Sequence, residues 1–471
     1  MLPEWVLKYK RKGTAIHKIG SRYYLYEIES KWDPSLKRAR KITKKYLGLI
    51  TPQGIIKPHS RLSLTNPKEY GACIYLIKSN PKIISYLKRY FPSWWQELFI
   101  LSCLRLIHKS PFKNMSIYYQ DSWFSEEFPK AKMYERAYKN LLVEVGSNRE
   151  NIIKFLKKFI LREEALLIDL THVFSYSKKQ ILVAKGYNSQ FDFSPQINLI
   201  FIFSFKRKLP LFYRILAGNV RDVRALKNTL EESEIEEAII VTDKGFYSKN
   251  NVNLLKREGL KFIMPLRRNN KLIDYSPLRR VDKREMDGYF KFNDRHIWYY
   301  GKRRDSLKLW VYLDEKLKVE EEQDYLNRID THPEEGYSRE GFHERVERFG
   351  TVALLTNLRV SAEQVFEYFK SRIEIELLFD VFKNILKADK SYMRGEKEME
   401  AWMFINYLSL VYYYKIYQEL LKRDLLKRYS VEDVLLHLRR IRKIKLQGNW
   451  VNLEVPKASK ELIDIMEIPI T

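Results

Sequence analysis

Three acidic residues, far apart in the chain, stand where their carboxylates could do chemistry together. Asp169 interrupts one apolar run, residues 165–170, and Asp243 ends another, residues 238–242. Both runs have the composition of buried strands, where an ionised carboxylate is costly unless it meets a cation or hydrogen-bond donors. Glu376 lies in a third, apolar segment with helical spacing. A divalent metal ion is the natural cation for such a set, and carboxylate-held metal ions cut or join phosphodiesters.

The segment around Glu376 predicts an α-helix with a charged stripe. Residues three, four or seven positions apart share a helix face. This rule places four residues on one stripe: Phe369, Arg372, Glu376 and Lys383. If the stripe faces Asp169 and Asp243, Glu376 completes the metal site and the two cations hold phosphates.

The same spacing assigns the rest of this helix. A capping box is expected at its start, formed by Ser361 and Gln364. Glu374 and Asp380 are rival carboxylates to Glu376, but Glu374 lies about 160° away around the helix and should point elsewhere. Three residues are expected to form the packing flank: Leu377, Leu378 and Phe382.

The composition restricts the class of partner. The chain has 471 residues, a formal net charge of +27 at pH 7 and 14% aromatic residues. The basic excess is spread along the whole chain, which indicates several surfaces facing a polyanion, and nucleic acid fits better than a membrane. No segment has the length of a transmembrane helix or the order of a signal peptide. Cys73 and Cys103 lie in apolar contexts typical of packed thiols, so an intracellular protein is expected.

The chain is too long for one ordinary core, so several domains are expected. The first two of six ranges are expected to bind DNA. The ranges are a basic β-hairpin module at 1–62, a helical domain at 63–163, the first part of an α/β core at 164–265, a β-rich insertion at 266–350, the second part of the core at 351–400, and C-terminal helices at 401–471.

The order of strands and helices in the core predicts its topology. Five strands are expected, with helices between the last three: 166–170, 197–204, 211–216, 238–242 and 261–264. Three antiparallel strands followed by alternating helices and parallel strands describe a ribonuclease-H-like sheet. In this topology the first and fourth strands are neighbours. Asp169 and Asp243 should therefore lie close together.

The N-terminal range is interpreted as a basic hairpin. Residues 22–32 alternate polar and apolar positions, and residues 38–48 return after a turn. Lys41, Thr43 and Lys45 are expected to project on one face, where the lysines could track DNA phosphates. The alternative is a solvated edge strand that its lysines protect from aggregation.

The helix with Glu376 resembles one in the DDE transposases of bacterial and archaeal insertion sequences. In the insertion-sequence-four-like lineage the signature is Tyr, two residues, Arg, three residues, Glu, six residues, Lys. The chain matches at Arg372, Glu376 and Lys383, and departs at Phe369, which cannot donate a phenolic hydrogen bond. The resemblance extends over most of the chain, to Asp169 in its strand, the motifs at 218–222 and 242–246, the hairpin end at 45–48 and the β-rich insertion.

The resemblance implies a cut-and-paste DNA transposase. Asp169, Asp243 and Glu376 would hold two Mg²⁺ or Mn²⁺ ions for cleavage at the transposon ends and transfer of the 3′-OH into target DNA. Arg372 and Lys383 would neutralise phosphates beside the scissile bond. The implied partners are double-stranded DNA, as terminal inverted repeats and target, and a second copy of the chain in a homodimeric synaptic complex. The implied location is the nucleoid of a prokaryotic cytoplasm.

Relatives also stack an aromatic residue of the insertion on a base flipped out near the cut. Trp298 is the candidate here and Trp310 the second, while a packing role between strands stays open for both. Three other functions remain open: a nuclease of the same fold without strand transfer, a catalytically silent DNA-binding derivative of a transposase, and an RNA-binding protein with basic aromatic surfaces. The intact carboxylates argue against the silent derivative.

Overall fold

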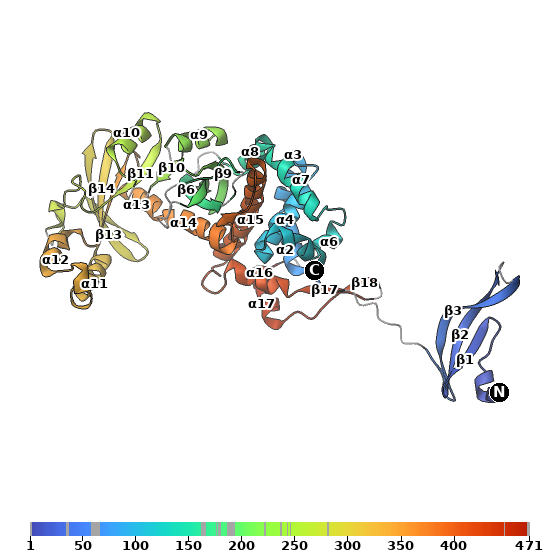
Figure 1. Cartoon of the computed structure of the whole chain (residues 1–471). Helices are drawn as coiled ribbons and strands as arrows, with labels where there is room; N and C mark the ends of the chain where they lie inside the picture. The colour runs from blue at the N-terminus through green and yellow to red at the C-terminus, as the bar shows by residue number, and fades with distance from the viewer. Residues whose placement is uncertain are drawn as a thin grey trace. The chain divides into compact units, whose positions relative to one another are not determined.

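The computed structural model describes residues 2–33, 37–57, 66–161, 166–175, 177, 180–185, 194–220, 223–235, 238–242, 244, 246–279, 282–446 and 448–468. They form two compact units (Figure 1). One comprises Met1–Asn66 with Ile444–Val451, and the other Pro67–Lys443 with Asn452–Thr471. The domain boundary expected at residue 62 lies close to the first of these divisions.

The N-terminal unit is an antiparallel sheet with one short helix. Its elements are α1 (Glu4–Leu7), β1 (Thr14–Ile19), β2 (Arg22–Asp33), β3 (Arg38–Thr51) and β4 (Gly54–Ile56), with the strands in chain order. Val6, Leu25 and Ile50 form its small buried core. The predicted hairpin is present as β2 and β3, although residues 34–36 at its tip lie outside the described residues.

Two bulges in β3 divide its side chains between the faces of this hairpin. Tyr26 pairs with Tyr46, Glu27 with Lys45 and Ile28 with Thr43, so Lys44 and Leu47 are the extra residues of β3. Paired residues project on the same face and neighbours along a strand on opposite faces. Lys45 therefore shares the face of Leu25 and Glu27, here called the core face.

The opposite face, here called the tyrosine face, carries Lys41 and Thr43 opposite Ser30 and Ile28. It also carries Tyr24, Tyr26 and Tyr46, with ring centroids 5.1 to 6.0 Å apart. The prediction that Lys41, Thr43 and Lys45 project on one face was wrong. It assumed uninterrupted alternation, and each bulge reverses the alternation of the residues beyond it.

The second unit begins with helices. They are α2 (Gly71–Ser79), α3 (Pro81–Tyr90), α4 (Trp95–His108), η1 (Phe112–Asn114), α5 (Met115–Asp121), α6 (Phe124–Glu127), α7 (Glu135–Gly146), α8 (Arg149–Leu156) and η2 (Lys157–Phe159). The long helix α15 (Glu396–Lys422) packs against α4 and α7 and against the edge of the central sheet (Figure 1). Helices from the second and the last predicted ranges therefore form one bundle.

The central sheet contains eleven strands among the described residues. Its core strands are β6 (Leu166–Ser175), β8 (Pro195–Ser204), β9 (Leu209–Ala217), β10 (Ile239–Val241) and β11 (Lys261–Leu266), and the short strands β7 (Ala184–Lys185) and β16 (Lys390–Ser391) pair with β8 and β6. The hydrogen-bonded order is β9-β8-β6-β10-β11, with β6, β8 and β9 antiparallel and β6, β10 and β11 parallel. Two helices lie between these strands in the chain: α9 (Val223–Ser233) comes between β9 and β10, and α10 (Lys249–Arg257) between β10 and β11. The first and fourth core strands are neighbours, as predicted.

The range expected to be a β-rich insertion contains helices as well as strands. Its elements are η3 (Ser276–Leu278), β12 (Gly288–Phe292), β13 (Arg295–Arg304), β14 (Leu307–Asp314), α11 (Glu315–Thr331), η4 (Pro333–Glu335), α12 (Arg339–Arg345) and η5 (Val346–Arg348). Three strands are present, as the β-rich composition predicts, but α11 and α12 follow them. Helix α11 was not predicted, because the aromatic and charged composition of this range is typical of strands. The helix begins at the N-cap residue Asp314, whose side chain accepts a hydrogen bond from the backbone N–H of Leu317 at 3.1 Å.

The three insertion strands continue the central sheet. Strand β15 (Thr351–Thr356) pairs on one edge with β14 and on the other with β11, in both cases antiparallel. Insertion and core therefore share one uninterrupted hydrogen-bonded sheet.

The chain then forms α13 (Ala362–Lys370), α14 (Arg372–Asp380) and a π-helical turn, η6 (Val381–Ile385). After α15 come α16 (Val431–Arg439), β17 (Arg442–Leu446), β18 (Asn449–Asn452) and α17 (Lys457–Met466). Helices were expected through the basic stretch at 437–445, but Arg442 and Lys443 pair with β5 (Lys68–Glu69) instead. The described helices all lack the length or the hydropathy to cross a bilayer.

Candidate active site

Strand β6 holds the first of the three carboxylates. Its residues Leu166, Leu167 and Ile168 are almost completely buried, and Asp169 follows them at the point where burial decreases. The side chain of Asp169 is 20% exposed, and its Oδ1 accepts a hydrogen bond from the backbone N–H of Leu170 at 2.8 Å. A largely apolar strand therefore carries one carboxylate at a position that solvent reaches.

The predicted helix forms as two helices with a break between them. The capping box of Ser361 and Gln364 is present at the start of α13. At Ser371 the helix is interrupted, and the Ser371 hydroxyl donates to the Tyr368 carbonyl at 2.7 Å. Arg372 is the first residue of α14, directly after this break.

Arg372 joins the first carboxylate to the third. Its Nε lies 3.6 Å from Asp169 Oδ2, and its Nη1 lies 3.1 Å from Glu376 Oε1. The guanidinium is one-quarter exposed, so these ion pairs are partly shielded from water. Two residues more than two hundred positions apart thus meet at a single cation.

Asp243 lies outside the described residues, but the strand before it is described. Residues Ile239 and Ile240 of β10 pair in parallel with Leu167 and Ile168 of β6. The chain leaving β10 therefore starts beside the position of Asp169.

Lys370, at the end of α13, is a cation that the sequence pattern did not single out. Burial lowers its pKa, and the positive charges of Arg295 and Lys244 lower it further, against the effect of Asp314.

The rival carboxylates on α14 have other partners. Glu374 forms an ion pair with Lys208, with 3.0 Å between Lys208 Nζ and Glu374 Oε1. Asp380 accepts from the Asn384 side chain at 2.6 Å. Glu374 thus points away from Asp169, as its position on the helix predicts. Tyr368, the aromatic neighbour of Phe369, contacts Phe205 with ring centroids 6.0 Å apart.

The packing flank of α14 differs in one residue from the prediction. Leu378 and Phe382 are completely buried, but Leu377 is 46% exposed and Ile375 is buried in its stead. Positions 375, 378 and 382 follow the three- and four-residue spacing of one stripe, which adjacent Leu377 leaves by about 100°.

Lys383 lies in the π-helical turn and is mostly buried. The backbone N–H of Leu386 donates to the Val381 carbonyl at 2.8 Å, a five-residue separation that interrupts the regular helix. The predicted stripe assumed regular spacing as far as Lys383, so it did not foresee this turn. Burial lowers the pKa of Lys383 to about 8, and the charge of Asp389 partly offsets this.

A buried arginine from the helical bundle holds the end of this turn. Arg105 on α4 donates from Nη2 to the Leu386 carbonyl at 2.6 Å and from Nη1 to the Ser110 carbonyl at 2.8 Å. Its Nε and Nη2 also donate to the Asn406 side chain on α15. The sequence pattern did not single out Arg105. Its one signal was a lone cation inside an apolar helix, which usually marks a buried hydrogen-bond network.

The two candidate tryptophans of the insertion differ in environment. Trp310 is 6% exposed, lies under Lys308, and packs edge-on against Tyr299. Trp298 is partly exposed and contacts Tyr289, whose side chain is 59% exposed, with ring centroids 5.0 Å apart. Of the two, Trp298 is the one that solvent reaches.

The carboxylate groups of the candidate site have the chemistry of ligands for a divalent metal ion. Hard carboxylate oxygens are the ligands that Mg²⁺ and Mn²⁺ prefer. Asp169 and Glu376 already converge on one cation, Arg372. Within the described residues there is no group of three or more His, Cys, Asp and Glu side chains placed to hold a metal ion, and Asp243 is outside that range. Cys73 and Cys103 are both free and buried, as expected for packed thiols.

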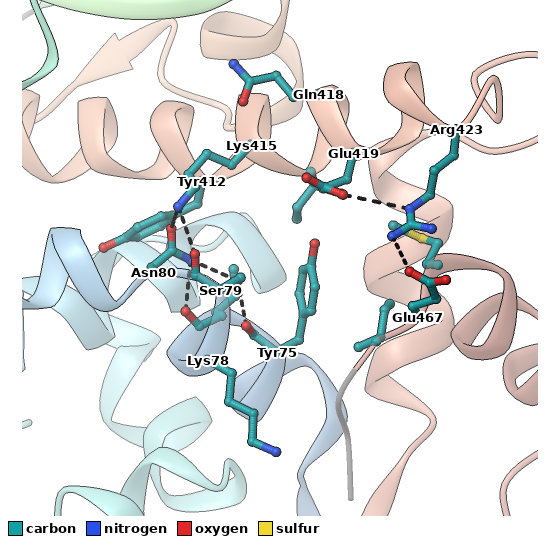
Figure 2. Close-up of a pocket in the computed structure, with 14 residues that line it drawn as sticks. Tyr75, Lys78, Ser79, Asn80, Tyr412, Lys415, Gln418, Glu419, Arg423 and Glu467 are labelled. Carbon is teal, nitrogen blue, oxygen red and sulfur yellow. Dashed lines mark hydrogen bonds and ion pairs between the residues drawn. The ribbon is translucent and has the colours of Figure 1, made fainter.

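A pocket of about 260 Å³ lies elsewhere, between α2 and α15 (Figure 2). Lys415 donates there to the Ser79 carbonyl and to the Asn80 side chain, both at 2.8 Å. Arg423 forms an ion pair with Glu467 at 3.1 Å. These polar groups bind one another, and none of the predicted site residues lines this pocket.

Comparison with known proteins identifies the family. Residues 161–412, more than half of the chain, match the family model described as the transposase DDE domain. No curated protein matches the chain. A similar solved structure is the cryo-EM structure of the piggyBac transposase synaptic complex with hairpin DNA, at 12% identity and a TM-score of 0.38, over 80% of this chain and 81% of that one.

The matched range includes Asp169, Asp243 and Glu376, the strand order around β6, and the helix pair α13 and α14. Proteins of this family are transposases that act on DNA and generally use divalent metal ions. The chain belongs to the DDE transposases.

Proposed function

We propose that this protein is a cut-and-paste DNA transposase of a prokaryotic insertion sequence. It would cleave DNA at the transposon ends and join the 3′-OH to target DNA, in the nucleoid of its host. The observation that carries the proposal is the Arg372 guanidinium, which holds Asp169 and Glu376 at one place. Family membership supports the reaction class.

We infer that the core is ribonuclease-H-like. The strand order β9-β8-β6-β10-β11, with three antiparallel strands followed by two parallel ones, supports this fold. In this sheet Asp169, within β6, lies beside the end of β10, so neighbouring positions on the two strands are available for two carboxylates.

In this proposal Asp169, Asp243 and Glu376 are the metal ligands. Bound there, two Mg²⁺ or Mn²⁺ ions would activate the attacking hydroxyl and stabilise the leaving oxygen. Arg372 neutralises two of the carboxylates and would turn to a DNA phosphate once they hold metal ions. Lys383 would contact a second phosphate, where the loss of one charge-assisted contact costs about 1.5 to 3 kcal/mol.

The remaining assignments rest on exposure and charge. Trp298, which has the exposed Tyr289 beside it, would stack on a displaced base. Measuring DNA cleavage by Trp298→Ala tests this role. Lys41 and Lys45 would contact DNA from opposite faces of the N-terminal hairpin. The active assembly would be a homodimer, because two transposon ends are joined in one event.

The test is Mg²⁺-dependent cleavage of DNA that carries the element's ends. Asp169→Asn, Asp243→Asn and Glu376→Gln keep shape and remove charge, so each should lower the cleavage rate by about 100-fold or more while DNA binding persists. Glu374→Gln is the matched control. Glu374 pairs with Lys208, so this variant should cleave at the wild-type rate. Normal cleavage by any of the three variants would remove that residue from the site.

A second assay separates transposition from simple cleavage. Pre-cut ends with a free 3′-OH are incubated with a plasmid target. Joined products support the transposase. Cleavage without joining would instead support a nuclease of the same fold, and binding without either reaction a catalytically silent derivative.

A further inference from the structure

Part of the N-terminal hairpin extends beyond its sheet as a two-stranded ribbon. Strand β1 pairs with β2 only from Arg22 to Glu27 within the described residues, and β4 pairs with β3 only from Leu49 to Thr51. Among the described residues, β2 pairs with β3 alone from Glu29 onward. The described side chains of residues 29–32 and 37–43 are all exposed. Free two-stranded ribbons are marginally stable in water, so this one is suited to a partner that supports it.

The size and charge of the ribbon fit duplex DNA. The major groove of B-DNA admits a two-stranded β-ribbon. Residues 1–66 contain fifteen Lys and Arg against four Asp and Glu. A basic ribbon of this width therefore matches the groove in both shape and charge.

The two faces of the ribbon differ in how their charges are balanced. On the core face, Glu27 stands opposite Lys45, and Glu29 forms an ion pair with the bulge residue Lys44 at 4.0 Å. The lysines of the core face are therefore partly neutralised. On the tyrosine face no acidic residue occurs among the described positions of β2 and β3, so the positive charge of Lys41 has no counterpart there.

The tyrosine face also has the chemistry of base recognition. Ser30 and Thr43 offer hydroxyls that donate and accept, and Lys41 can donate to the acceptors of guanine in the major groove. Toward the base of the ribbon the same face continues with Tyr26 and Tyr46. The bulge at Leu47 is what turns Tyr46 to this side, and bulges often re-aim side chains at functional sites.

Gly48 makes this bulge sterically possible. Its φ is +148°, and a Cβ at this position would lie 2.4 Å from the Ile56 carbonyl oxygen. Another residue could not adopt this backbone so close to β4. The orientation of the tyrosine face is thus built into the strand.

We propose that the tyrosine face of the ribbon reads base sequence in the major groove of duplex DNA. Ser30, Lys41 and Thr43 would contact base edges, and Arg38 and Arg40 of the core face would reach the flanking phosphates. This inference rests on the proposed transposase function and deepens it, because it assigns recognition of the transposon end to one face of the hairpin.

The experiment selects DNA from a duplex library with a randomised central segment, using the full-length chain. Lys41→Ala/Thr43→Ala alters the tyrosine face. Arg40→Ala/Ile42→Ala is the matched control, because it removes one cation and one exposed side chain at alternate positions of the same strand on the core face. Circular dichroism verifies that both variants are folded.

The wild type should select a defined motif, and the control variant should select the same motif with weaker binding overall. In the tyrosine-face variant, the preference for the motif base over other bases should fall by about 10- to 100-fold at one or two base pairs. This variant should bind unselected DNA nearly as well as the control variant does. The proposal is overturned if the tyrosine-face variant selects the wild-type motif, if the control variant loses it, if the wild type selects none, or if RNA outcompetes the duplex.

The result is separable from the test of the transposase itself. If the reading proposal fails, cleavage remains dependent on Mg²⁺ and on Asp169. If the transposase proposal fails, that dependence is absent, whereas motif selection by the ribbon is unaffected.

Discussion

At the scale of single residues, the candidate site is organised by cations as much as by carboxylates. Arg372 bridges Asp169 and Glu376, and Lys208 forms an ion pair with Glu374. Two carboxylates thus share one cation, while the rival carboxylate has a partner of its own. A phosphate that approaches would compete for the same cations, so substrate binding and carboxylate position are coupled.

Lys383 gives a prediction with a defined pH range. Its pKa is lowered to about 8, so the free protein carries this charge at pH 7 and has largely lost it at pH 9. DNA affinity of the wild type should therefore fall between pH 7 and pH 9 by about tenfold more than that of Lys383→Arg, whose guanidinium stays charged. Lys383→Met should bind weakly at both values. Fluorescence anisotropy with labelled duplex measures this, and parallel profiles for lysine and arginine would contradict it.

Stability should respond to the same group with the opposite sign. A lysine whose pKa is lowered on folding releases its proton first in the folded state, so the unfolded chain binds more protons between pH 8 and 10.5. The free energy of unfolding should rise over this range in the wild type relative to Lys383→Met. Urea unfolding at the two ends of the range measures the difference.

At the scale of elements, the segment from α13 to η6 is shaped by two interruptions. The break at Ser371 comes directly before Arg372, which pairs with Asp169 on β6, and the π-helical turn at 381–385 contains the partly buried Lys383. Interruptions of this kind are common where a helix carries functional side chains, and they need support from outside the helix.

Arg105 supplies that support, so its removal should destabilise the protein. Arg105→Met leaves the Leu386 carbonyl and the Asn406 side chain without their buried donor, and should lower the free energy of unfolding by about 3 kcal/mol. Arg136→Met, at an exposed position on α7, is the control and should stay within about 0.5 kcal/mol of wild type. Equal unfolding midpoints for the two variants would rule out the anchoring role.

The sequence was informative about elements where its spacing was regular. Asp169 and Glu376 were singled out because an apolar strand and a helical stripe are local patterns, and the structure brings both to Arg372. The adjacency of β6 and β10 followed from the order of strands. Asp243 itself stays a prediction, since it lies outside the described residues.

The failures came from features with no local pattern. The bulges of β3 separate Lys41 from Lys45, the π-helical turn alters the stripe before Lys383, and α11 lies in a range with strand-like composition. Arg105 acts through contacts with residues about three hundred positions away. Hydrophobic periodicity in the sequence reports none of these features.

At the scale of the whole molecule, the catalytic sheet and the helical bundle are joined by a buried ion network. Arg149 on α8 lies 2.7 Å from Glu400 on α15 and 3.2 Å from Glu232 on α9, and it donates to the Tyr213 carbonyl on β9 at 2.8 Å. The Tyr213 hydroxyl donates to Glu400 as well. Four elements thus share one arginine.

Removal of this arginine should weaken the whole second unit. Arg149→Met leaves Glu400 as a largely buried charge without its cation, and leaves Glu232 with Arg214 alone, 3.9 Å away. It should lower the free energy of unfolding by about 3 kcal/mol. Arg149→Met/Glu400→Gln should recover part of the loss, because it removes the unpaired charge of Glu400. Urea unfolding measures both, and a single variant as stable as the wild type would contradict the network's role.

The position of β15 limits how this protein can be truncated or combined with related transposases in a chimera. Strand β15 is hydrogen-bonded to both β14 and β11. Excision of the strands before it would turn β15, an apolar strand with buried Leu354 and Leu355, into a sheet edge with unpaired backbone groups. Open borders of this kind recruit strands from other molecules and lead to aggregates. A trimmed or chimeric protein would therefore stay monodisperse only if another strand, or a row of lysines, were grafted where β14 had been.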